Sequence, residues 1–186
     1  MEWVNEPAAW AADGDELSFV TGDATDFWRE THYGFHHDNG HLYGERVSGD
    51  FTAEVVFGAE YSAHYDQAGL MLRASPVEWV KAGIEYAHGQ YCLSVVVTHG
   101  VSDWSVWPID HDGAPLGLRM TRKGRALCVQ WRRETGGSWR MLRLAAVPDA
   151  PGALVGPMAC SPSRAGLKAW FRGFKTGDAV DFANAV

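Results

Sequence analysis

The fold is decided by the stretch from Tyr65 to Thr98, which reads YDQAGLMLRASPVEWVKAGIEYAHGQYCLSVVVT. Apolar residues alternate along it with glycine, polar and charged residues, which is the period-two pattern of strands that turn one face to a core. Residues typical of tight turns divide the stretch into three segments of similar length. It therefore predicts three consecutive antiparallel strands.

Turn chemistry sets the register of these strands and of a fourth, Val101 to Trp107. We expect two-residue turns at His88-Gly89 and His99-Gly100, and a five-residue loop from Ala74 to Glu78. The opposed pairs are then residues 67 and 85, 71 and 81, 73 and 79, 85 and 92, 83 and 94, 81 and 96, 96 and 103, 94 and 105, and 92 and 107.

This register sorts the side chains onto two faces. One face is apolar apart from Ser102, and burying each large aliphatic side chain is worth roughly 1.5 to 3 kcal/mol, so we assign it to the core. Its apolar residues are Ala68, Leu70, Leu72, Val80, Ala82, Ile84, Leu93, Val95, Val97, Trp104 and Val106. A slip of one residue would expose them all.

The opposite face is predicted to carry a shallow trough between Lys81 and Glu85. One row of this face has almost no side-chain volume, and it consists of Gly69, Gly83, Ser94 and Ser105. Glycine inside a strand marks close approach by a ligand or by another backbone. The trough is therefore expected to hold either a ligand or a loop, such as the segment from His32 to His41.

The candidate ligand-binding residues are the polar and aromatic side chains of this face. They are Gln67, Arg73, Trp79, Lys81, Glu85, Ser94, Asp103, Ser105 and Trp107. The loop ahead of the sheet could add Trp28, His32 and Tyr33. Convergent polar groups beside aromatic rings are typical of small-molecule sites, although tryptophans also fill the cores of sheet proteins.

The rest of the chain continues the same architecture. Turns recur every 8 to 12 residues or so, and no apolar pattern keeps the period of a helix for three turns. Asn39-Gly40 predicts a further hairpin inside the segment from Tyr33 to Tyr43. The pattern favours an all-β fold, a two-sheet antiparallel jelly-roll sandwich, with residues 1–186 as a single domain.

Composition and charge limit the environment and the partners. No apolar run reaches the roughly 20 residues of a membrane helix, and Cys92, Cys128 and Cys160 are widely spaced, as expected for free thiols in a reducing compartment. Residues 1–90 carry a net charge of −12 and residues 91–186 one of +5. Because the halves interleave in an antiparallel domain, this predicts cross-strand ion pairs. We expect a cytoplasmic protein without a membrane or nucleic-acid partner.

Catalytic groups are not evident in the predicted sheet. Glycoside hydrolysis uses two carboxyl groups roughly 5 to 9.5 Å apart, whereas the predicted register separates Glu85 from Asp103 by about 16 Å. Cys92 has no histidine beside it as a base. The sequence therefore identifies no catalytic residue and no cofactor, and whether the protein is an enzyme stays open. A hydrolase would need a group from the loop Asp26 to His41 to reach Glu85.

Four histidines crowd one short segment. They are His32, His36, His37 and His41. A zinc site there is one interpretation, but the spacing is not that of a closed zinc site, and an exposed hairpin needs no metal. We therefore predict no metal.

Several segments together resemble the regulation-of-enolase-protein family, a domain-of-unknown-function group in the concanavalin A-like lectin and glucanase superfamily. They are TDFWRETHYGF (25–35), GDF (49–51), YDQAGLMLR (65–73), WVKAGIEY (79–86), SDWSV (102–106) and VGPMACSP (155–162), followed by Phe171 and Phe174. The resemblance implies a concanavalin A-like jelly roll whose concave sheet is the ligand surface. It implies no established activity, because the superfamily's glucanase strand Glu-x-Asp-x-Glu and its lectin metal loop are both missing.

Three hypotheses follow. The first is a non-catalytic module that binds a small hydroxylated or carbohydrate ligand on the concave sheet. The second is a regulatory protein that binds a protein partner, such as a metabolic enzyme. The third is an unrecognised hydrolase.

Overall fold

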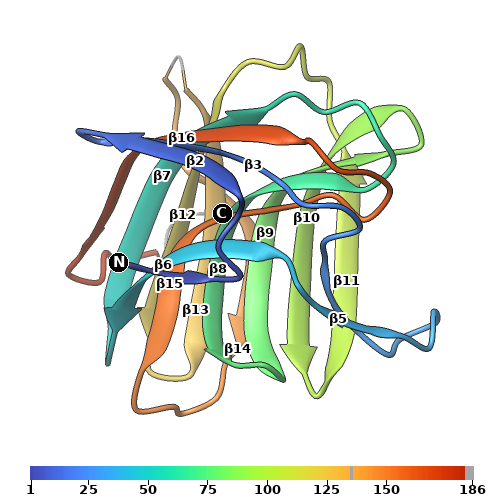
Figure 1. Ribbon diagram of the computed structural model, residues 1–186. Helices are drawn as coiled ribbons and strands as arrows, with labels where there is room; N and C mark the ends of the chain where they lie inside the picture. The colour runs from blue at the N-terminus through green and yellow to red at the C-terminus, as the bar shows by residue number, and fades with distance from the viewer. Residues whose placement is uncertain (135, 183–186) are drawn as a thin grey trace.

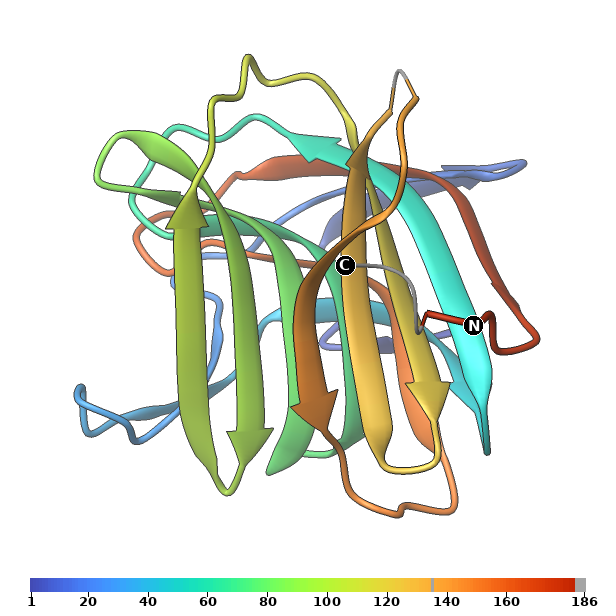
Figure 2. The same cartoon turned by 180° about the vertical axis from the view of Figure 1, so that it is seen from behind.

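The computed structural model describes residues 1–134 and 136–182, and within them it is a sandwich of antiparallel sheets (Figures 1 and 2). The first sheet runs in the order β1 (Glu2–Val4), β6 (His41–Val47), β15 (Ala153–Cys160), β8 (Asp66–Ser75), β9 (Glu78–Ala87), β10 (Gln90–His99) and β11 (Val101–Pro108). The second runs β14 (Arg140–Ala146), β13 (Ala126–Arg133), β12 (Leu116–Lys123), β7 (Phe51–Ala59), β16 (Lys168–Gly177), β3 (Glu16–Val20) and β2 (Ala9–Asp13). The predicted all-β, two-sheet sandwich is confirmed.

A small third sheet pairs β4 (Phe27–Arg29) with β5 (His36–Asp38). In Figure 1 this hairpin, in blue, projects beside β11. The part of the chain that the structure describes contains no helix with the length and apolar character of a membrane span.

The main core lies between the inner faces of the two sheets. On the first sheet it takes the apolar residues that alternation predicted for β8, β9 and β10, from Ala68 to Val97, and all of them are buried. The second sheet contributes large side chains such as Phe57, Met120 and Phe171. Burial of these alternating residues fixes which face of each strand turns inward.

The predicted register of β8, β9 and β10 is confirmed. Gln67 lies opposite Glu85, Met71 opposite Lys81, and Ser94 opposite Gly83. The connection from β8 to β9 is shorter than the predicted five-residue loop, because Ser75 already pairs with Glu78 after a register shift. The turn at His88-Gly89 has positive φ at both residues, as a two-residue type I′ hairpin requires.

The predicted register of β11 is wrong by one residue. Val96 lies opposite Trp104 and not residue 103, because Gly100, at φ +75°, turns the chain within a three-residue connection from Thr98 to Ser102. Every side chain of β11 therefore lies on the face opposite to the predicted one. Trp104 points away from the core.

The predicted hairpin at Asn39-Gly40 is also wrong. The strands on either side of this turn enter different sheets, β5 beside β4 and β6 beside β1 and β15. The backbone N–H groups of Asn39 and Gly40 both donate to the carbonyl of Asp26, and the Asn39 side chain accepts from the Asp26 N–H. The Asn-Gly pair thus fastens β5 to the start of β4.

The predicted ion pairs across strands are confirmed. Arg119 of β12 pairs with Glu54 of β7 at 2.6 Å, and Lys175 of β16 reaches the same Glu54 at 3.6 Å. Opposite charges from the two halves of the sequence therefore meet, as expected when the halves interleave.

Gly69 and Gly83 face each other on β8 and β9 because the two backbones approach closely. A Cβ atom on Gly83 would collide with the carbonyl oxygen of Ala68 and lie 2.8 Å from the Cα of Gly69. A Cβ atom on Gly69 would collide with the carbonyl oxygen of Ala82. Of the two predicted reasons for these glycines, the structure shows close approach by another backbone.

Replacing Gly83 with alanine should therefore destabilise the sheet by roughly 2 to 3 kcal/mol, since neighbouring backbone cannot yield as a side chain can. Urea unfolding measures the change. The matched control is Gly177→Ala at the end of β16, where a new Cβ would meet nothing within 4 Å and which should be nearly neutral. Equal stability of the two variants would contradict the steric explanation.

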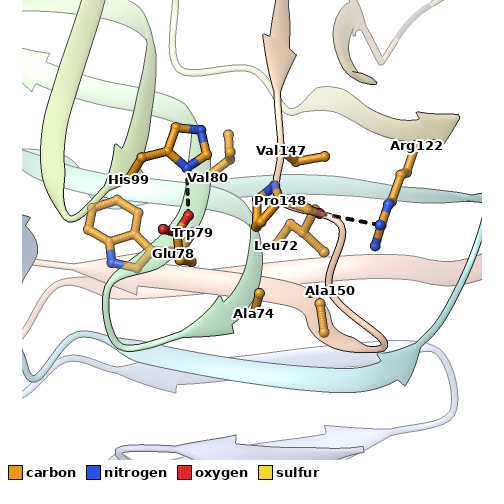
Figure 3. A pocket seen from close by; sticks show the side chains of 11 residues that line it. Leu72, Ala74, Glu78, Trp79, Val80, His99, Arg122, Val147, Pro148 and Ala150 are labelled. Atoms are coloured by element: carbon orange, nitrogen blue, oxygen red, sulfur yellow. Dashed lines mark hydrogen bonds and ion pairs between the residues drawn. The ribbon is translucent and has the colours of Figure 1, made fainter. Parts of the chain in front are cut away.

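His99 links the two sheets beside a small cavity (Figure 3). Its Nδ1 lies 2.6 Å from Oε2 of Glu78, and its Nε2 donates at 3.0 Å to the carbonyl of Ala146, the last residue of β14. On the other side of this cavity, Arg122 donates to the carbonyl of Pro148. The hydrogen bond with Glu78 is the main reason why the pKa of His99 is raised.

A raised pKa means that His99 adds stability below its unfolded pKa of about 6.5 and that this contribution is lost as pH rises through the folded pKa. We expect the wild type to exceed His99→Gln by up to about 1 kcal/mol near pH 6, because the pair is partly exposed. The difference should shrink by about pH 8. Urea unfolding at the two pH values checks this, and a constant difference would contradict it.

Candidate functional site

The outer face of the first sheet, which points away from the second sheet, is partly covered by the β4–β5 hairpin. Phe27 of β4 is fully buried, and its ring lies 6.1 Å from that of Trp79, which is only 3% exposed. These side chains belong to a second apolar cluster, which consists of Phe27, Trp28, Leu42, Met71, Trp79, Val96, Met158 and Cys160. The hairpin therefore covers the Trp79 end of the outer face, while the predicted loop from His32 to His41 in the trough at Gly69 and Gly83 stays a prediction.

Polar contacts hold the hairpin on the sheet at three points. The Arg29 N–H donates to Oγ of Ser102 at 3.0 Å, and its guanidinium donates to the carbonyl of Gly100 at 2.8 Å. Arg73 pairs with Asp38 at 2.9 Å. The third point is a buried ion pair between Lys81 and Asp26, with 2.7 Å between Nζ and Oδ1.

A cavity of about 230 Å³ remains beside the covered area, between the hairpin and the strands β8 to β11. Its wall consists of Asp26, Trp28, Tyr33, Phe35, Tyr65, Gln67, Lys81, Glu85, Val96, Trp104 and Pro162. The volume lies below the roughly 300 to 1,000 Å³ of typical sites for drug-sized ligands, so the cavity suits a small molecule.

Aromatic rings form much of the wall and meet nearly at right angles. Trp28 and Trp104 have ring centroids 6.4 Å apart and an interplanar angle of 88°. Tyr65 and Trp104 have values of 6.1 Å and 81°. The hydroxyls of Tyr33 and Tyr65 lie 3.1 Å apart, which links the hairpin to the start of β8. The cavity is thus bordered by ring faces and ring edges.

Charged groups form the floor. Burial by itself would lower the pKa of Lys81, but the carboxylate of Asp26 and other nearby negative groups outweigh burial, so the pKa is raised and the amine stays charged. Glu85 accepts a hydrogen bond from Nε1 of Trp104 at 3.0 Å. Burial raises the pKa of Glu85, and the hydrogen bond with Ser94 and the charge of Lys81 offset only part of that effect.

Tyr65 reaches the cavity from a backbone position that bulky residues rarely adopt, with φ at +68°. The next residue fixes it there. Asp66 is fully buried and accepts hydrogen bonds from the N–H groups of Ser62 and Ala63, from Oγ of Ser161 at 2.7 Å, and from Arg164 at 2.7 Å. A left-handed position of this kind costs on the order of 1 to 3 kcal/mol and persists only where neighbouring contacts over-determine it.

Asp66→Asn should lower the free energy of unfolding by about 2 kcal/mol, because hydrogen bonds to a buried charge are replaced by weaker ones. Burial alone would raise the pKa of Asp66, but the bonds from Arg164, Ala63, Ser161 and Ser62 lower it. Its contribution is therefore present above the unfolded pKa of about 4 and lost as pH falls through the folded pKa.

Urea unfolding near pH 7 and near pH 3 measures this contribution, and the difference between wild type and Asp66→Asn should be smaller at the lower pH. The matched control is Asp23→Asn, at an exposed position, which should leave stability unchanged. A difference that stays constant with pH would count against the assigned role of Asp66.

The structure brings together five of the predicted site residues around the cavity. They are Trp28, Tyr33, Gln67, Lys81 and Glu85. Ser94 lies just behind them, where its Oγ accepts from Nε1 of Trp104 at 3.1 Å. Whether these side chains bind a ligand remains a prediction.

The other predicted site residues lie away from the cavity wall. Arg73 and Trp79 are covered by the hairpin. His32 packs on Tyr33 at the hairpin tip and is not part of the wall. The one-residue shift of β11 removes the last three, since Asp103 and Ser105 contact Arg143 of the second sheet and Trp107 is 71% exposed. Their predicted place on the outer face is wrong.

The wall also contains residues that the sequence did not single out. They are Asp26, Phe35, Tyr65, Val96, Trp104 and Pro162. Trp104 was missed because of the register of β11. Ser102, the one polar residue on the predicted core face, was a signal that the register of β11 was wrong. The next commonest hairpin after the two-residue turn is a three-residue connection with glycine at a left-handed position, and it gives the observed register.

The histidine cluster has structural partners. His36 pairs with Glu30 at 2.7 Å, and Nε2 of the buried His41 accepts from the N–H of Gly22 at 3.0 Å. Among residues 1–134 and 136–182, no group of three or more His, Cys, Asp or Glu side chains is placed to hold a metal ion. Cys92, Cys128 and Cys160 are free and buried.

Comparison with known proteins identifies the family. The profile of a family described as "Protein of unknown function (DUF1349)" matches residues 3–179, so the chain belongs to this family. Regulation of enolase protein 1 of Saccharomyces cerevisiae is a relative, with 41% identity over 169 residues, which cover 91% of this chain and 85% of the yeast protein. The resemblance stated from sequence segments is thereby confirmed.

Two solved structures place the fold among known sandwiches. A functionally unknown protein from Saccharomyces cerevisiae has 38% identity and a TM-score of 0.93, with 97% of each chain covered. The carbohydrate-binding module CBM66 from Bacillus subtilis has a TM-score of 0.58 at 15% identity, with 95% of each chain covered. At that identity the second similarity shows the fold alone.

Proposed function

We propose that this protein is a non-catalytic binding module that holds a small hydroxylated or carbohydrate ligand in the cavity between the β4–β5 hairpin and the first sheet. The observation that carries the proposal is the make-up of the wall, in which perpendicular aromatic rings surround a floor of buried polar groups. Cavities of this composition are the usual places of small-molecule recognition.

The two parts of the wall suit the two parts of such a ligand. The C–H faces of a sugar or polyol pack on aromatic rings, here Trp28, Tyr65 and Trp104. Its hydroxyl groups hydrogen-bond to the floor, where the amide of Gln67 can donate and accept and the carboxylate of Glu85 accepts. Hydrogen bonds to charged groups are shorter and stronger than neutral ones, so the floor supplies orientation.

The structural role of Asp26 favours binding over hydrolysis. It is the loop carboxylate that shares the cavity with Glu85, as the hydrolase hypothesis requires. However, its Oδ1 accepts hydrogen bonds from Nζ of Lys81 and from the N–H of Phe27, so this oxygen fastens the hairpin to the sheet. The fold shared with CBM66 supports a binding role by analogy. We place this function in the cytoplasm, in keeping with three free cysteines.

Calorimetric titration with a panel of monosaccharides, polyols and amino alcohols tests the proposal. At least one member should bind saturably, and Trp104→Ala should weaken it by about tenfold or more, as expected for the loss of a ring from a desolvated wall. The matched control is Trp107→Ala, a change of the same size at an exposed position outside the cavity, which should bind like the wild type. If no panel member binds in a way that Trp104→Ala weakens, the proposal fails.

A second candidate is a regulatory protein that binds a metabolic enzyme. The name of the yeast relative favours it. Tyr33 and Phe35, each 42% exposed with stacked rings 5.4 Å apart, provide an apolar contact point at the hairpin tip. Affinity capture with the wild type and with Tyr33→Ser/Phe35→Ser tests this function, since a protein partner lost in the double variant would support it and the absence of any captured partner would count against it. Both side chains also line the cavity, so the double variant does not report on small-molecule binding.

A further inference from the structure

The buried charges around the cavity do not balance. Lys81 is the only cation in the wall, and its Nζ is already paired with Asp26 at 2.7 Å. Within the described residues, Glu85 forms no salt bridge of its own and is held by hydrogen-bonding neighbours, Trp104 and Ser94. With all three groups ionised the wall carries one net negative charge, and Glu85 bears it at 5% exposure.

A buried carboxylate without a cation is costly, and a positively charged ligand group relieves that cost. A neutral sugar would leave the charge of Glu85 offset only in part, by its hydrogen bonds and by the nearby Lys81. An anionic ligand would meet the carboxylates of Asp26 and Glu85, and the ammonium of Lys81 is not free to receive it. The charge distribution alone therefore favours a cation over a neutral or anionic ligand.

The aromatic wall favours the same kind of ligand. Trp28 and Tyr65 both stand nearly perpendicular to Trp104, with ring centroids 6.4 and 6.1 Å from that of Trp104. All three side chains line the same cavity, so a ligand there lies beside aromatic rings. A cation is attracted to each face within about 6 Å of the ring centroid, and quaternary ammonium groups are the ligands that such arrangements recognise.

We propose that the ligand of this cavity carries a small alkylammonium group, which lies against Trp28, Tyr65 and Trp104 with Glu85 as its counter-ion. The inference rests on the proposed function and specifies its ligand as a hydroxylated amine, such as an amino alcohol. The hydroxyl group meets the remaining polar floor at Gln67. The Asp66 contacts fix Tyr65 in its left-handed position, so this part of the cavity wall is formed before any ligand enters.

Choline and its neutral carbon isostere, in which a tert-butyl group replaces the trimethylammonium group, test the inference because they have the same shape and differ in charge. We expect choline to bind the wild type at least tenfold more tightly by calorimetry. Glu85→Gln keeps the size of the side chain and an amide oxygen that can accept from Nε1 of Trp104, but it removes the negative charge, so it should abolish most of this preference. Thermal unfolding of the variant confirms that it is folded.

The matched control is Glu16→Gln, which removes the same charge from an exposed position on β3 of the second sheet and should retain the preference for choline. Equal or tighter binding of the isostere or of neutral sugars, unchanged by Glu85→Gln, would overturn the inference and leave the proposed function standing. If neither charged nor neutral ligands bind in a way that Trp104→Ala weakens, both fail.

Discussion

The site depends on one buried ion pair, Asp26 with Lys81, which joins the β4–β5 hairpin to the middle of the first sheet. Both charges are removed from water, so each would be costly to bury alone. The pair also fixes how far the hairpin reaches across the sheet. Apolar packing of Phe27 on Trp79 closes one side, and the space that remains on the other side becomes the cavity.

The sequence predicts the central sheet well and its margins poorly, for physical reasons. In β8, β9 and β10 both neighbours of each strand are present and one face is fully buried, so alternation permits a single register. β11 is an edge strand whose inner residues Asp103 and Ser105 meet Arg143 at the margin of the sandwich. Its polarity pattern is therefore reversed relative to that of a core strand, and the turn alone decides the register.

The cavity residues on the central strands could be predicted from the sequence, and those at the margins or in loops could not. Gln67, Lys81 and Glu85 were found because they lie on correctly registered strands. Asp26 was considered only as a loop carboxylate, and Tyr65 was not considered, because their positions depend on contacts between residues far apart in the chain, such as Asp66 with Arg164. No local pattern encodes these contacts. Asn39-Gly40 likewise has the sequence of a simple hairpin turn, but its hydrogen bonds go to Asp26, a residue that the local pattern does not point to.

The placement of the hairpin has a consequence for how this fold diversifies. The segment between β3 and β6 supplies Asp26, Trp28, Tyr33 and Phe35 to the cavity, yet the core between the two sheets is built from other strands. Substitutions or length changes in this segment can reshape the cavity while the packing that keeps the domain folded stays as it is. The hairpin side of the cavity can therefore vary while the main core keeps its packing, provided that Phe27 and Asp26 still fasten the segment to the sheet.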